Sequence, residues 1–155
     1  MTESTQSRDL TESQLDILAY WMSLRAVAGV PVRGSFDPGA VLRHLRDISV
    51  LELTETGDVN CRVSSASQAS RLPEAALSGL RTLGLGRLLD QRAPVYGRRK
   101  AGHGTHHWLR LPLLSDCGSR LMILCHDEFV LERHQAEGKS RGVRRFSLSG
   151  IPIAA

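Results

Sequence analysis

The residues from Thr105 to Leu113 constrain the fold of this chain more than any other segment. Large apolar side chains recur there at every second position, which is the period of a β-strand with one buried face. One face of this strand would carry His106, Trp108 and Arg110, and the other would carry His107, Leu109, Leu111 and Leu113. The chain must therefore build a sheet, and its other segments must supply the neighbouring strands and a cover for the apolar face.

The front of the chain predicts helices that can provide this cover. Thr11 and Gln14 have the spacing of a capping box, in which the two residues satisfy each other's free amides. Apolar residues then recur at helical spacing until Gly29 and Pro31 end the helix. Asp37-Pro38 starts a second, short helix, whose buried face we expect to contain Val41, Leu42 and Leu45.

The period-two pattern predicts four further strands, at residues 48–53, 59–63, 93–98 and 120–125. Residues 66–91 between them fit short helices or loops, because Gly79, Gly84 and Gly86 interrupt a long helix. Residues 127–137 fit a terminal helix. We therefore expect a flexible N-terminus over 1–10, one domain over 11–126, and a C-terminal helix with a basic tail over 127–155.

Two strands, a helical middle and three strands make an α+β fold, with a five-stranded antiparallel sheet, helices on one face and an N-terminal flanking helix. This order resembles the PAS sensor fold. Individual residues strengthen the resemblance to a bacterial stand-alone PAS-type family, whose pattern "W…R…P.R…DP…LPL..dG" is matched here by Trp21, Arg25, Pro31, Arg33, Asp37-Pro38, Leu111-Pro112-Leu113 and Asp116-Cys117-Gly118.

The resemblance implies a sensory domain that signals by dimerisation or by contact with another signalling protein, and it implies no catalytic residues. As the contact surface we expect the first helix, through Leu15, Leu18, Trp21 and Met22. The alternative is a receptor that holds a small molecule or cofactor in the PAS cavity. Candidate ligand contacts are then Trp21, Arg25, Arg33 and Asp37, although a structural role is the simpler expectation for each.

Composition favours a cytoplasmic domain, and the family resemblance implies a bacterial one. The 155 residues suffice for one compact domain, and 41% of them are hydrophobic. The longest apolar runs are too short to cross a bilayer, and the polar start of the chain lacks the features of a secretory signal. Three cysteines do not form a disulfide framework. We therefore expect no membrane contact. We also expect no cofactor, because the helical stretch that lines the ligand cavity in the family is shortened here.

The charge is distributed unevenly. Residues 1–60 carry a net −4 and residues 61–126 a net +7, and 18 of the 20 basic residues are arginine. Arginine suits bidentate contacts to phosphate, so anion or nucleic-acid binding through this middle segment is a further alternative. We do not expect nucleic acid to be the main partner, because only seven residues are Trp, Tyr or Phe and solvated loop charge explains the clusters at 98–100 and 141–145.

Histidines and cysteines offer the remaining candidates for chemistry. Three histidines fall within residues 103–107, and His103 and His107 would share a strand face and offer a metal two imidazoles. No zinc-type spacing accompanies them, and we expect no metal. Cys61 and Cys125 are expected to be buried strand residues, and Cys117 to lie exposed in a turn.

Overall fold

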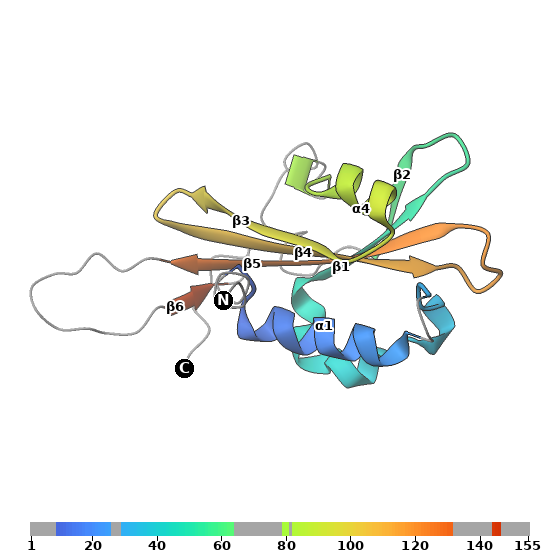
Figure 1. The fold of residues 1–155 in the computed structure, drawn as a ribbon. Helices are drawn as coiled ribbons and strands as arrows, with labels where there is room; N and C mark the ends of the chain where they lie inside the picture. Colours follow the sequence, from blue (N-terminus) through green and yellow to red (C-terminus); the bar gives the residue numbers. More distant parts are fainter. Residues whose placement is uncertain (1–8, 26–28, 64–78, 81, 132–143, 147–155) are drawn as a thin grey trace, which may run out of the picture.

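The computed structural model describes residues 9–25, 29–63, 79–80, 82–131 and 144–146. Its main element is an antiparallel sheet with the strand order β2-β1-β5-β4-β3 (Figure 1). The strands are β1 (Ile48–Leu53), β2 (Val59–Val63), β3 (Val95–Ala101), β4 (Gly104–Leu114) and β5 (Leu121–Leu131). All five lie where the alternating patterns predict a strand, and β4 and β5 pair along their whole length.

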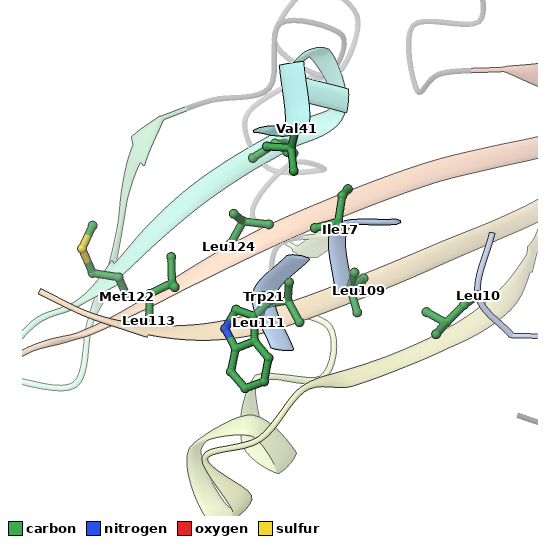
Figure 2. Close-up of a cluster of buried hydrophobic side chains, with 10 residues drawn as sticks. Leu10, Ile17, Trp21, Val41, Leu109, Leu111, Leu113, Met122 and Leu124 are labelled. Carbon is green, nitrogen blue, oxygen red and sulfur yellow. The ribbon is translucent and has the colours of Figure 1, made fainter. Parts of the chain in front are cut away.

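Helix α1 (Glu12–Leu24) and the 3₁₀ segment η3 (Pro38–Asp47) cover one face of this sheet (Figure 1). They bury the larger apolar cluster of the molecule, in which Ile17 and Trp21 of α1 and Val41 of η3 pack on the leucines of β4 (Figure 2). The predicted division of the β4 side chains between two faces is confirmed, because Leu109, Leu111 and Leu113 all lie in this cluster.

Helix α4 (Leu85–Gln91) lies on the opposite face, where Leu85 and Leu88 pack with residues of β1, β3 and β5 (Figure 1). Helices therefore cover both faces, whereas the sequence pattern led us to expect them on one. The side chain of Trp108 on β4 packs between the sheet and this second layer, close to β3. A Cβ atom placed on Gly97 of β3 would lie 2.5 Å from the Trp108 ring, so the indole can lie across β3 only because that position has no side chain.

The predicted terminal helix is wrong for the residues that the structure describes. β5 continues without interruption from Leu121 to Leu131, and Asp127 to Leu131 pair with β4. A short strand β6 (Arg144–Phe146) then pairs with the end of β5. The misassigned residues Asp127 and Glu128 are charged, and their polarity hid a strand that is buried up to Glu128. Residues 132–137 lie outside the described residues.

The second predicted helix is present, but as a 3₁₀ segment with a kink at Val41. Three residues per turn place Val41 and His44 toward the sheet, and they leave Leu42 on the outside. Leu42 is therefore 68% exposed, contrary to the predicted buried face, while Val41 is buried and Leu45 half-buried. Apart from these differences, the α+β PAS-like fold with an N-terminal helix is confirmed.

Candidate functional site

Helix α1 is fixed to the sheet by two buried polar side chains. Gln14 completes the predicted capping box by accepting a hydrogen bond from the amide of Thr11, and its own Nε2 donates to the carbonyl oxygens of His107 and His126 at 3.1 and 3.4 Å. About two turns further along the helix, the indole Nε1 of Trp21 donates to the Pro112 carbonyl at 2.8 Å. Both side chains are buried, so the helix cannot roll without breaking these bonds.

This anchoring leaves one side of α1 exposed to solvent. We define the contact stripe as Leu15, Leu18, Ala19 and Met22, which are one helical turn apart or adjacent on the wheel. Leu15 is 43% and Met22 54% exposed, Ala19 is exposed and Leu18 is half-buried. Three of the four residues predicted to form an interaction surface thus reach the surface. The fourth, Trp21, is 1% exposed and does not.

The predicted ligand contacts do not meet in one place. Trp21 lies under α1, and Arg25 lies over its ring with 5.6 Å between the guanidinium and the ring centroid. Arg33 is exposed in the short 3₁₀ turn Arg33–Ser35. Asp37 caps η3 by accepting from the amide of Gly39 at 2.9 Å, and its own amide donates to the Tyr20 hydroxyl. These contacts fix local structure, and no ion pair joins Arg33 to Asp37 among the described residues.

The junction between α1, η3 and β5 contains a pair of imidazoles. His44 of η3 lies 3.6 Å from the carboxylate of Asp16 on α1 and stacks edge-on against His126 of β5. His126 is buried, and its Nδ1 has no hydrogen-bond partner in the part of the chain that the structure describes. Burial lowers the pKa of His126 to about 3, so this imidazole is neutral at physiological pH.

The opposite face of the sheet contains a polar cluster that the sequence analysis missed. We define the buried charge network as His106, Arg110 and Asp127, from strands β4 and β5; the exposed Arg99 of β3 is hydrogen-bonded to its edge. The carboxylate of Asp127 accepts from His106 Nε2 at 2.7 Å and from Arg110 at 3.0 and 3.3 Å. His106, Arg110 and Asp127 are fully buried. The misread helix over residues 127–137 concealed the network, because it removed Asp127 from the strand that faces Arg110.

The hydrogen bonds of the network determine which ring nitrogen of His106 acts as donor. Arg99 Nε can only donate, so His106 Nδ1 accepts and its Nε2 carries the proton that faces Asp127. Burial by itself would raise the pKa of Asp127, but the charge of Arg110 and the hydrogen bonds from His106 and Arg110 outweigh it and lower the pKa. Arg110 also donates to the carbonyls of Leu109 and Leu80. Four of its five donors are therefore used inside the protein, and we assign the guanidinium a structural role.

The predicted histidine pair does not form a shared face. β4 begins at Gly104, so His103 lies in the preceding turn and is exposed. His107 is buried, and its Nδ1 bonds the Asp9 carbonyl at 2.9 Å. Within the described part of the chain, no three His, Cys, Asp or Glu side chains cluster as metal ligands would.

The three cysteines are free thiols, and their positions differ partly from expectation. Cys125 is buried as predicted. Cys61 was expected to be buried as well but is exposed, because every residue of the edge strand β2 is exposed. Cys117 lies exposed in the β4–β5 turn, where hydrogen bonds with Ser115 and Ser119 lower its pKa to about 7.

Comparison with protein families supports the class that the fold defines. Residues 10–74 match the family model of a PAS domain, which confirms the predicted resemblance over α1, η3, β1 and β2. No curated protein and no solved structure matches the chain. Among the helices of the described residues, none combines the length and apolar character needed to span a bilayer.

Proposed function

We propose that this chain is a non-enzymatic sensory or signalling module that acts by contact with a second protein chain, and that the contact stripe of α1 is the surface it uses. The PAS domain match supports the sensory class. The exposure of Leu15 and Met22 on an otherwise anchored helix supports the surface. The exposed free thiols of Cys61 and Cys117 suit a reducing, cytoplasmic compartment.

Leu15 and Met22, the two most exposed large residues of the stripe, are not needed to hold the helix in place, whereas Leu18 also packs against the core. Gln14, Ile17 and Trp21 already attach α1 to the sheet, and all three are buried. Leu15 and Met22 point the other way and keep about half of their surface in water, which is unfavourable unless something covers it. Clustered exposed apolar side chains on a helix are typical of protein contact surfaces.

We propose a second copy of the chain as the partner. The stripe carries no charged residue, so two copies can meet along it without bringing like charges together. A two-fold contact requires only that one surface matches itself, and an uncharged helical stripe with the small residue Ala19 at its centre meets that requirement. Association with a different signalling protein is the other outcome to be tested.

A small-molecule receptor is less well supported. Its candidate contacts Trp21, Arg25, Arg33 and Asp37 are spread over α1, the short turn after it and the cap of η3, and the bonds of Trp21 and Asp37 are internal. The contact proposal needs no rearrangement of these residues, whereas a shared ligand site would need one.

The test is light scattering after size exclusion with wild type, Leu15→Glu and Met22→Glu. Glutamate is a good helix former, so both variants should fold. We expect the wild type to approach twice the chain mass of 17.0 kDa as concentration rises, and each variant to stay at the monomer mass. Stable interfaces bury about 800 Å² per partner, more than one helical stripe provides, so the series should extend to several hundred micromolar protein, about the range of weak association.

The matched control is Leu89→Glu. Leu89 lies on α4, on the opposite face of the sheet, and is 36% exposed. This control should associate like the wild type. A wild type that remains monomeric throughout would contradict the homodimer. Equal dissociation of the Leu89→Glu variant would show that added charge, rather than the stripe, controls association.

A further inference from the structure

We define the helical layer as α1 and η3, which cover the same face of the sheet (Figure 1). Contacts within the layer join its two parts. His44 and Arg43 of η3 lie 3.6 and 3.4 Å from the carboxylate of Asp16 on α1. The Tyr20 hydroxyl on α1 accepts a hydrogen bond at 2.9 Å from the amide of Asp37, directly before η3. Because these contacts tie α1 to η3 and not to the sheet, the two segments can leave the sheet together.

The sheet under the helical layer is held by its own backbone ladder. Residues 48–52 of β1 and residues 104–114 of β4 pair with β5. The layer contributes to none of these pairings, and buried side chains attach it to the sheet: Gln14, Ile17, Trp21 and Val41. A segment that is attached by side chains alone can open at a lower free energy than the paired strands beneath it.

His126 of β5 lies between the sheet and the helical layer. The residue is 1% exposed, and its ring meets His44 of η3 edge-on, with 6.2 Å between the ring centroids. Gln14 of α1 donates to its carbonyl oxygen, and its strand partners Leu109 and Ile48 are apolar. Among the described residues, none bonds its Nδ1. A protonated imidazole carries a hydrogen on both nitrogens, so protonation would bury a donor without an acceptor.

The charges near His126 do not compensate for this cost. Burial lowers the pKa of His126 from 6.5 to about 3, and the charges of His44 and Arg110 act in the same direction. Asp127 acts in the opposite direction, but its carboxylate pairs with Arg110 on the other face of the sheet. Asp16, the carboxylate that α1 brings to this junction, faces His44. With the helical layer in place, His126 therefore stays neutral.

From this placement we infer that the helical layer is an acid-released cover: protonation of His126 by solvent detaches α1 and η3 from the sheet and withdraws the contact stripe. The regulatory part of this inference rests on the proposed contact function, because the stripe lies on α1. The direction follows from linkage. With the layer open, the ring is in water and returns to its ordinary pKa of 6.5, whereas with the layer closed its pKa is about 3. The closed state is therefore fully favoured above pH 6.5 and loses stability as the pH falls toward 3.

Hydrogen–deuterium exchange of the whole chain, measured by mass spectrometry of peptic fragments, tests the release. The protein is kept dilute enough to be monomeric, so the result does not depend on self-association. Protection is expressed relative to the unstructured exchange rate at the same pH. The two pKa values predict that the opening constant of the helical layer rises about 20-fold between pH 7 and pH 5. The amides of α1 should also be less protected than those of β4 at both pH values.

Two variants remove the titrating ring. His126→Leu and His126→Gln should each reduce the rise to less than about 3-fold, and either one keeps the test valid if the other does not fold. The matched control is His103→Leu, because His103 is an exposed histidine in the β3–β4 turn, away from the helical layer. This control should keep the 20-fold rise. A rise that survives in both His126 variants would overturn the inference and assign the acid sensitivity to another group.

Equal protection of α1 and β4 at every pH would also overturn the inference, because the layer would then open only with the whole domain. Light scattering at pH 7 and pH 5 tests the effect on the contact stripe. We expect the wild type to dissociate at pH 5 and His126→Gln to remain associated. Association that persists at pH 5 while α1 is released would contradict the control of the stripe. A wild type that is monomeric at both pH values, with the exchange result intact, would contradict the proposed contact surface and leave the acid release standing.

Discussion

The two faces of the sheet are stabilised in different ways. On the α1 face, a continuous apolar cluster is sealed by Gln14 and Trp21, whose polar atoms end on backbone carbonyls. On the α4 face, a smaller apolar cluster adjoins the buried charge network around Asp127. A substitution in the apolar cluster of the α1 face should lower the stability in proportion to the apolar area that it removes. On the α4 face, stability depends on whether each buried charge keeps its partner.

The largest loss of stability is predicted for a substitution in the buried charge network of the α4 face. Asp127→Ala leaves the Arg110 guanidinium buried without its carboxylate, and loss of one partner of a buried pair costs about 3–5 kcal/mol of unfolding free energy. Urea unfolding measures this loss. The double variant Arg110→Met/Asp127→Leu should recover most of it, because no uncompensated charge remains. A loss below about 1 kcal/mol for Asp127→Ala would mean that the network is hydrated and not buried as described.

A smaller effect is expected on the α1 face. Gln14→Ala removes the two bonds to the sheet, and it leaves the buried amide of Thr11 without its side-chain acceptor. We expect a loss of about 1–3 kcal/mol in the same urea experiment. The exposed neighbour Ser23→Ala serves as control and should change stability by less than about 0.5 kcal/mol. Equal losses in the two variants would contradict the anchoring role of Gln14.

Counted per pH unit, the smallest effect is a pH dependence that sharpens the comparison. The folded-state pKa of His126 is about 3, below its value of 6.5 in the unfolded chain, so the unfolded state binds more protons between these values. Stability from this residue is therefore complete above pH 6.5 and falls as the pH drops toward 3, by up to about 1.4 kcal/mol per unit. Urea unfolding of wild type and His126→Leu from pH 7 to 4.5 should show the shallower slope in the variant. Identical slopes would contradict a neutral, buried His126.

The sequence predicted one of these faces much better than the other. The capping box and the alternation of β4 are local patterns, and a periodic pattern can be read without knowing which element packs on it. The buried charge network is not local. Arg110 and Asp127 meet only because β4 and β5 pair in one register, and a charged residue such as Asp127 looks like a helix start until that register is known.

The sequence patterns also failed to predict whether some individual residues are buried or exposed. Leu42 was expected inside and lies outside because η3 has 3₁₀ geometry, and Cys61 is exposed because β2 is an edge strand. In both cases the sequence pattern correctly predicted a helical segment or a strand. Whether another element covers a given residue depends on the whole fold, which the local pattern does not contain.

Sedimentation equilibrium of the unmodified wild-type chain over a broad concentration range tests the central claim most directly, because it needs no substitution. A reversible rise from 17.0 kDa toward twice that mass, unaffected by added reductant, is the result that an apolar contact along α1 predicts. A mass that stays at one chain at every concentration would contradict self-association. A rise that disappears with reductant would assign it to the exposed thiols of Cys61 or Cys117 instead of the contact stripe.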